Sequence, residues 1–283
     1  MKRTTEVKER ARHIFRLLEA EVAANRLILP SLPEVALRVR TLTTMDSTTF
    51  AELEREIARD AGIAARVMKV ANSSLLRRGV PITSLKQAVA CLGMNLVRSL
   101  VTQLAVLQTM QSGGGNRERL RGFVAGGVHI SALCHCLAEP FPHLDAELAA
   151  LGGLLHDIGK LPLREFLQRQ PELSPLERLQ FELMLHPHVG AMLLRHWQMP
   201  DELVQMARWH ESILRETGNP QPDYVDLVIA ANLLHYGTQK GRYARYAGID
   251  IPAVGKVANA GHRVNDQNGA QLRVELMQAL VSG

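Results

Sequence analysis

The stretch Gly153-Leu154-Leu155-His156-Asp157-Ile158-Gly159-Lys160-Leu161 places an imidazole and a carboxylate on neighbouring residues between small and apolar ones. Neighbours in a helix point about 100° apart, so both side chains reach one metal ion only where a helix ends or kinks. We expect Gly152, Gly153 and Gly159 to give the backbone that freedom, and Pro162 to end the element soon afterwards. Because more histidines follow downstream, the pair predicts a metal site at a helix end.

The composition predicts a soluble, mainly helical protein. The chain has 283 residues, enough for one large domain or two smaller ones with a substantial core. Hydrophobic residues make up 46%, charged residues 22% and aromatic residues only 4%, which favours helix over sheet. The formal net charge of +5 is mild and diffuse, so it gives no reason to expect specific nucleic-acid binding.

The sequence contains no pattern typical of export or of membrane insertion. Charged residues follow Met1-Lys2-Arg3 where a signal peptide would have an apolar core. The longest apolar stretch, 88–110, is interrupted by Asn95, Arg98 and Gln103, which favours a buried helix over a membrane span. The three cysteines form neither a spaced ligand set nor an even disulfide framework. We therefore expect a cytoplasmic protein with reduced thiols.

The N-terminal segment 1–28 is expected to be an amphipathic helix. Its apolar residues recur three and four positions apart: Val7, Ala11, Ile14, Phe15, Leu18 and Val22. The simpler interpretation is that this stripe packs on the same chain. The alternative is a helix for homodimerisation or for a partner.

Residues 29–111 read as a lobe of about five short helices without a strand. Ser31 is a candidate helix cap, and Thr49 and Ser84 each begin a capping-box spacing that ends in Glu52 and Gln87. The three consecutive glycines at 113–115 cannot hold a helix cheaply, so they predict a loop and the best domain boundary.

Residues 117–283 read as a second helical lobe with a tail, so the whole chain is expected to be all-α. Ser174-Pro175-Leu176-Glu177 is a further helix start. Helical patterns cover 123–138, 145–155, 163–168, 176–185, 187–197, 201–212, 224–236 and 271–280.

Histidines are the candidate metal ligands beside His156 and Asp157. They are His129, His135, His186, His188, His196, His210 and His235. Imidazole and carboxylate together suit zinc, iron, manganese or nickel, and such sites support phosphoester hydrolysis. We expect Pro187 to start a helix and His186 to point inward at its entrance. His188, His196 and His235 are expected to be surface or ordinary core histidines.

Several motifs together resemble the HDOD family, a group of bacterial signalling output domains related to the HD phosphohydrolases. The motifs are Leu29-Pro30-x-Leu32-Pro33, Asp60, Asn72-Ser73, Ala88-Val89-x-x-Leu92-Gly93, the stretch 153–161, Val189-Gly190-Ala191 and Trp197-x-x-Pro200. The resemblance runs from about 29 to about 236. It implies an all-helical fold in which an N-terminal lobe, 29–111, packs on an HD-like lobe, 117–283.

The same resemblance implies a reduced metal shell. The HD pattern has a histidine one helix before the His-Asp pair, at the position of Gly126 here, and a late aspartate at the position of Asn232. An amide oxygen is a weaker ligand for a divalent ion than a carboxylate. His129 lies one turn beyond Gly126 and is a candidate replacement.

The related cyclic-di-GMP phosphodiesterases are similar to this chain at His156, Asp157, Lys160, His186 and His210. Their paired histidines are replaced here by Trp209-His210, and their Gly-Tyr-Pro signature by Ser212-Ile213-Leu214.

Two functions follow from the resemblance. The first is a non-catalytic regulatory protein that binds a signalling partner or a small ligand, with His156 and Asp157 hydrogen-bonded in the core. The second is a metal-dependent phosphohydrolase acting on a nucleotide or cyclic dinucleotide. In that case His156, Asp157, His186 and His210 hold one divalent transition-metal ion, and Lys160 neutralises phosphate charge. The combination of Gly126 and Asn232 favours the first.

A third hypothesis is nucleotide binding by residues 240–246, where basic and aromatic side chains alternate, although a solvated surface turn explains this pattern more simply. A regulatory role also needs an input. We expect a separate partner to engage the N-terminal helix or the cleft between the lobes.

Overall fold

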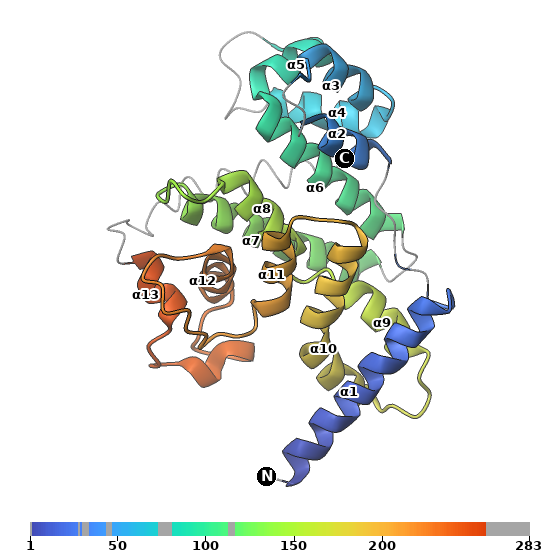
Figure 1. Ribbon diagram of the computed structural model, residues 1–283, viewed down its shortest axis with the longest axis vertical. Helices are drawn as coiled ribbons and strands as arrows, with labels where there is room; N and C mark the ends of the chain where they lie inside the picture. The colour runs from blue at the N-terminus through green and yellow to red at the C-terminus, as the bar shows by residue number, and fades with distance from the viewer. Residues whose placement is uncertain are drawn as a thin grey trace.

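The computed structural model describes residues 2–27, 29, 34–43, 47–72, 81–112 and 117–258, and the regular structure within them is helical throughout (Figure 1). The all-α prediction is therefore confirmed. The elements in these ranges are α1 (Lys2–Ala23), α2 (Glu34–Thr43), α3 (Phe50–Ile57), α4 (Ala61–Ala71), α5 (Leu85–Leu92), α6 (Met94–Ser112), α7 (Arg117–Ala138), α8 (Ala146–Leu155), α9 (Lys160–Gln168), α10 (Pro175–His196), α11 (Asp201–Trp209), α12 (Tyr224–Tyr236), the 3-10 helix η1 (Gly241–Tyr246) and α13 (Pro252–Ala258).

Helices α2 to α6 form the lobe at the top of Figure 1, with the capping predicted from the sequence. Thr49 and Ser84 both complete capping boxes, at the starts of α3 and α5. Asn72 ends α4, and its side-chain amide exchanges hydrogen bonds of 2.7 and 2.8 Å with the backbone of Ile82. Local side-chain chemistry thus sets the starts of α3 and α5 and the end of α4. The expected cap at Ser31, Ser73 of the Asn-Ser motif, the glycine loop 113–115 and the helix 271–280 lie outside the described residues.

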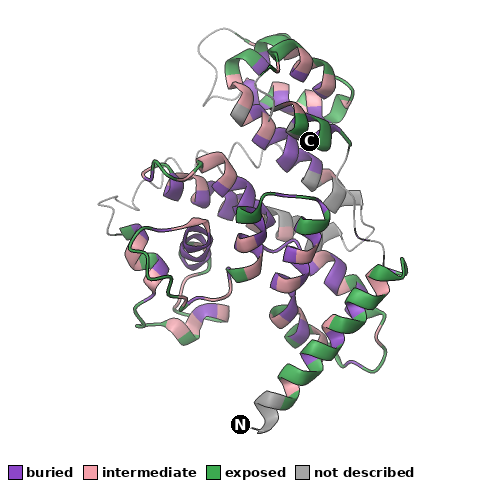
Figure 2. Cartoon of the chain, viewed as in Figure 1, coloured by how far each residue is buried: buried purple, intermediate pink, exposed green. Residues whose placement is uncertain are grey.

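Helices α7 to α13 form the second lobe, with α12 in its interior (Figure 2). Every residue of α12 from Val225 to Leu233 is buried. A single apolar core connects the two lobes, because Val97 and Leu104 of α6 belong to the same buried cluster as Leu154 of α8. Burial in this core is the main force that holds the lobes together.

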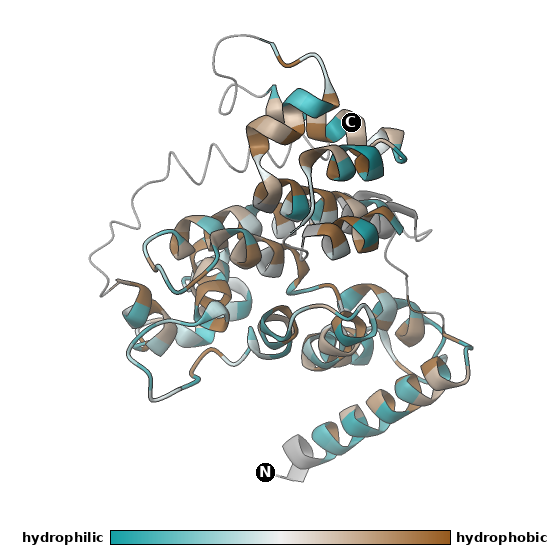
Figure 3. Cartoon of the chain, turned by 45° about the horizontal axis from the view of Figure 1, so that its top comes forward, coloured by the Kyte–Doolittle hydropathy of each residue, from teal (hydrophilic) through white to brown (hydrophobic). Residues whose placement is uncertain are grey.

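The N-terminal helix α1 packs on the second lobe of its own chain. Its buried residues Ala11, Ile14 and Leu18 join a cluster with Phe166 of α9 and Phe181 of α10. Along α1 the ribbon in Figure 3 alternates between brown and teal, as expected for a helix with one apolar stripe. The simpler of the two interpretations of this stripe is thus the one that the structure shows.

Two predictions about prolines were wrong. Helices were expected at 176–185 and 187–197, but α10 runs through Pro187 without a break. Pro187 removes one backbone hydrogen bond, while Leu185 and Val189 on either side remain buried on the same face of the helix. Pro162 does not end an element either. It lies in the first turn of α9, where the backbone N–H groups have no helical partner in any case.

Among the described residues, no single helix combines the length and apolar character needed to cross a bilayer, although the bent pair 85–92 and 96–105 meets those two criteria jointly.

Candidate metal centre

The His-Asp stretch forms the turn between α8 and α9. Helix α8 ends at Leu155 and α9 begins at Lys160, so the predicted helix end is confirmed. The glycines were expected to supply backbone freedom at this turn. That explanation is wrong for Gly159, because its φ of −63° is ordinary for any residue. A Cβ at Gly159 would lie 2.2 Å from the carbonyl oxygen of His186 and 2.3 Å from the backbone nitrogen of Gly190. Gly159 is therefore required for close approach of the turn to α10.

Four side chains from three distant segments meet behind this turn. They are Asp157 from the turn, His186 from α10, and His210 and Glu211 from the end of α11, with donor atoms that all lie within 4.8 Å of one another. Asp157 Oδ1 is 3.1 Å from His186 Nε2 and 3.3 Å from His210 Nε2. The two Nε2 atoms are 3.0 Å apart.

The hydrogen bonds of the two imidazoles leave their Nε2 lone pairs facing this centre. His186 Nδ1 donates to the carbonyl of Glu182 at 2.8 Å, and His210 Nδ1 donates to the carbonyl of Ala207 at 2.9 Å. Burial lowers the pKa of His186 to about 4, so its ring is neutral at pH 7. Lone pairs and a carboxylate oxygen repel one another unless a cation lies between them. Backbone carbonyls that hold the far ring nitrogens are typical of metal-ligating histidines.

His156 lies beside the four donors and not among them. Its Nδ1 donates to the carbonyl of Gly153 at 2.7 Å, and its Nε2 is buried without a hydrogen-bond partner, 3.5 Å from Asp157 Oδ2. Burial lowers the pKa of His156 to about 3. Of the four predicted ligands, Asp157, His186 and His210 are thus brought together in one cluster, and His156 flanks it.

Lys160 is buried and forms an ion pair with Asp157. Burial lowers the pKa of Lys160. Burial opposes ionisation of Asp157 as well, but the Lys160 ammonium that faces it favours the carboxylate, and the pKa of Asp157 lies well below the usual value. The Lys160 ammonium therefore already neutralises the Asp157 carboxylate.

Two roles at this centre were not predicted from the sequence, that of Glu211 as a fourth donor and that of Arg242 as its partner. Glu211 Oε1 lies 3.5 Å from His210 Nε2, and Arg242 of η1 forms an ion pair with the same oxygen. The Arg242 guanidinium sits 4.7 Å from the ring centroid of Tyr243 and 5.4 Å from that of Tyr236. One feature of the sequence could have indicated Glu211 as a ligand. Its carboxylate lies at a helix C-terminus, where the helix dipole disfavours a negative charge unless a cation is near.

The remaining histidines lie elsewhere. His129 packs against His235, with ring centroids 4.6 Å apart and ring planes tilted by 45°, and it is not one of the four clustered donors. His188 faces Phe15 of α1, and His196 is exposed.

The two positions at which the resemblance implied further ligands carry neither the histidine nor the aspartate of the HD pattern, but Gly126 and Asn232. A Cβ added at Gly126 would lie 3.6 Å from the hydroxyl of Tyr236. Asn232 is fully buried, and neither atom of its amide has a hydrogen-bond partner within the described part of the chain.

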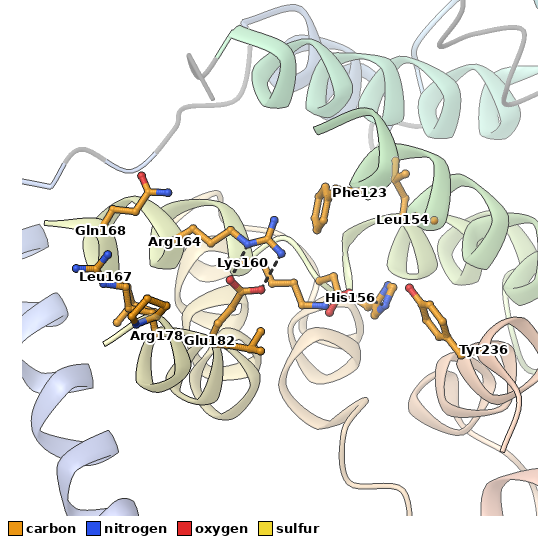
Figure 4. A pocket seen from close by; sticks show the side chains of 15 residues that line it. Phe123, Leu154, His156, Lys160, Arg164, Leu167, Gln168, Arg178, Glu182 and Tyr236 are labelled. Atoms are coloured by element: carbon orange, nitrogen blue, oxygen red, sulfur yellow. Dashed lines mark hydrogen bonds and ion pairs between the residues drawn. The ribbon is translucent and has the colours of Figure 1, made fainter. Parts of the chain in front are cut away.

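A cavity of about 680 Å³ opens in front of the turn (Figure 4). Arg164 and Glu182 form a double hydrogen bond of 2.6 and 2.7 Å across its wall. Of the four clustered donors, Asp157 alone lines this cavity. Its lining residues include Phe123, Gly126, His156, Asp157, Lys160, Arg164, Arg178, Glu182 and Tyr236.

Comparison with known proteins finds a matching family profile and a distantly related protein. The sequence profile of the HDOD domain matches residues 29–213. A protein of uncharacterised function from Treponema pallidum (strain Nichols) is 21% identical over 231 residues, which are 76% of this chain and 44% of that protein, so this chain spans less than half of the relative's length.

Solved structures show the same fold. A protein from Shewanella amazonensis, provisionally named a metal-dependent phosphohydrolase, has a TM-score of 0.69 and 22% identity over 93% of this chain and 99% of its own. An HDOD domain protein of unknown function from Geobacter sulfurreducens has a TM-score of 0.64 and 20% identity over 93% and 97% of the two chains.

Proposed function

This chain belongs to the HDOD domain family, and from that premise we propose that it is a signal-transduction protein that acts by binding and not by catalysis. Its second lobe holds one divalent transition-metal ion with Asp157, His186, His210 and Glu211. The observation that carries the proposal is the convergence of two Nε2 lone pairs on the Asp157 carboxylate. Two imidazoles and two carboxylates form a donor set suited to zinc, iron or manganese.

The placement of these donors argues against catalysis. A bound metal of this class polarises phosphoryl oxygens and activates water, and for that purpose it needs an open coordination position toward the substrate. Here Asp157 alone reaches the cavity, whereas His186 and His210 are fully buried and Glu211 is paired with Arg242. A closed set of four ligands is typical of a structural metal site.

The cavity itself suits a small phosphate-bearing ligand such as a nucleotide second messenger. Its volume of about 680 Å³ is within the range usual for such ligands. Lys160 and Arg164 are already paired with carboxylates, but the buried Nε of Arg178 has no hydrogen-bond partner. The rings of Phe123 and Tyr236 offer faces on which a base can stack.

Metal analysis of the tag-free protein tests the proposed centre. We expect His186→Gln and Asp157→Asn each to contain one equivalent of transition metal less than the unchanged protein. His196→Gln, which changes an exposed histidine on the same helix, should contain as much metal as the unchanged protein. Metal content unaffected by His186→Gln would refute the centre.

Turnover of cyclic dinucleotides and of a generic phosphodiester by the metal-loaded protein tests the non-catalytic role. We expect no hydrolysis above the rate of Asp157→Asn. Hydrolysis that depends on Asp157 would establish the alternative, a metal-dependent phosphohydrolase.

A nucleotide titration separates two possible binding sites. We expect Arg178→Ala to weaken binding and Arg195→Ala, an exposed arginine on α10, to leave it unchanged. The double change Arg242→Ala plus Arg245→Ala addresses the hypothesis for residues 240–246. Arg242 forms an ion pair with Glu211, and Tyr243 is buried. We therefore expect unchanged nucleotide affinity and attribute the alternating basic and aromatic residues of 240–246 to internal packing.

We propose that the partner approaches the cleft between the lobes or the charged outer face of α1, because the apolar stripe of α1 is covered. Capture of the partner by the full chain, compared with a chain lacking residues 1–28, distinguishes these two surfaces.

A further inference from the structure

A second group of metal-ligating side chains lies at the C-terminal end of α7, apart from the centre at Asp157. His135, Cys136 and Glu139 have donor atoms within 4.8 Å of one another. Glu147, in the first turn of α8, accepts a hydrogen bond from His135 Nε2, which lies 3.1 Å from its Oε1.

The hydrogen bond to Glu147 determines what the other ring nitrogen of His135 can do. A proton on Nε2 leaves the lone pair on Nδ1. That Nδ1 atom is buried and has no hydrogen-bond partner, and it faces Glu139 Oε1 at 3.5 Å. A lone pair opposite a carboxylate requires a cation between them, either a proton on the ring or a metal ion. A carboxylate behind a histidine is the arrangement that orients zinc-binding imidazoles.

The donor atoms and their surroundings favour the metal. Nitrogen, sulfur and oxygen donors together suit zinc, and a thiolate selects zinc over hard cations such as magnesium. Two ligands of one tetrahedral zinc lie about 3.5 Å apart, so the observed spacing needs only side-chain rotation. Glu139 is largely exposed and free to rotate inward. The end of α7 also carries the partial negative charge of the helix dipole, which attracts a cation.

We propose that His135, Cys136 and Glu139 bind a zinc-like divalent ion, with water in the fourth position and Glu147 as the positioning residue behind His135. The site adjoins the contact between the lobes. Arg98 of α6 lies 3.8 Å from Asp145, and Ser99 of α6 donates to the backbone carbonyl of Glu147 at 3.5 Å.

Cobalt(II) substitution tests this site by a signal that the first centre cannot give. Asp157, His186, His210 and Glu211 include no sulfur, so a near-ultraviolet thiolate-to-cobalt charge-transfer band reports a cysteine-containing site alone. We expect the band in the full-length protein titrated with cobalt(II), in Asp157→Asn and in Cys91→Ser, which changes an exposed cysteine on α5. We expect its loss in Cys136→Ser.

Two further variants separate a metal site from a protonated histidine. Glu147→Gln should weaken zinc affinity, measured by chelator competition, by about 10- to 100-fold while the band remains at saturation. His135→Gln should abolish the band, with the fold checked by circular dichroism. Absence of the band in the unchanged protein, or its persistence in Cys136→Ser, would overturn the proposal and leave His135 as an imidazolium between two carboxylates. If the protein binds no metal at Asp157 but shows the cobalt charge-transfer band, only the proposal for the first centre is refuted.

Discussion

The contact between Gly159 and α10 gives the sharpest test of how the metal centre is built. A Cβ at Gly159 would lie 2.2 Å from the carbonyl oxygen of His186, 2.3 Å from the nitrogen of Gly190 and 2.8 Å from its Cα. All three atoms belong to the backbone of one helix, so no side chain can rotate away. Carbon contacts are normally about 3.5 Å or longer, so α10 and the turn must separate by about 1 Å in Gly159→Ala.

That separation should be visible in both stability and metal binding. Overpacking of this kind costs about 1–3 kcal/mol, which corresponds to a fall in Tm of roughly 2–12 °C at the size of this chain. Because Asp157 lies two residues before Gly159 and His186 is carried by α10, the same movement pulls two of the proposed ligands apart. We therefore expect weaker metal binding as well as a lower Tm.

Gly190→Ala is the matched control on the opposite side of the contact. A Cβ there would lie 3.4 Å from the nitrogen of Gly159 and 3.5 Å from Cβ of Ala207, which is ordinary contact. Inside a helix, alanine is favoured over glycine by about 1 kcal/mol, so we expect unchanged or higher Tm. Thermal unfolding with and without added metal is the assay. Equal Tm and equal metal affinity for Gly159→Ala and the unchanged protein would refute the close-approach argument.

Two further predictions concern α1. Hydrogen bonds from the backbone and hydroxyl of Ser174, with the Arg10 guanidinium at 2.6 Å, lower the pKa of Glu177 to about 2. The carboxylate therefore stabilises the fold fully above its ordinary pKa of 4.5, and this stabilisation is lost as the pH falls toward 2. Denaturant unfolding should show Glu177→Gln less stable than the unchanged protein at neutral pH, with a difference that shrinks on acidification; a constant difference would contradict this. Leu18 is 0% exposed and Leu17 38%, so Leu18→Ala should cost about 2–5 kcal/mol and Leu17→Ala well under about 1 kcal/mol. If Leu18→Ala instead split a dimer, seen by light scattering, without loss of monomer stability, the stripe would belong to a subunit interface.

The sequence by itself determined the helix starts and the local shape of the site. The capping boxes at Thr49 and Ser84 were predicted, because each depends on a hydrogen bond between residues three positions apart. The helix start at Ser174 was predicted too, and the structure shows a capping box there as well. The helix end at His156 was predicted from the residues around it, whereas the inward position of His186 was predicted from a helix start at Pro187 that the structure does not have. The motifs between 29 and 213 likewise indicated the family.

Tertiary structure decided which of these local features serve the site. Nothing local reveals that α10 continues through Pro187, because burial on both sides of the proline outweighs one lost hydrogen bond. The pairing of Glu211 with Arg242 joins residues of α11 and η1 that are 31 positions apart, and only the packing of the second lobe brings them together. Gly159 shows the same limit. Its backbone conformation is ordinary, and its need for a hydrogen in place of a side chain comes entirely from the helix that lies against it.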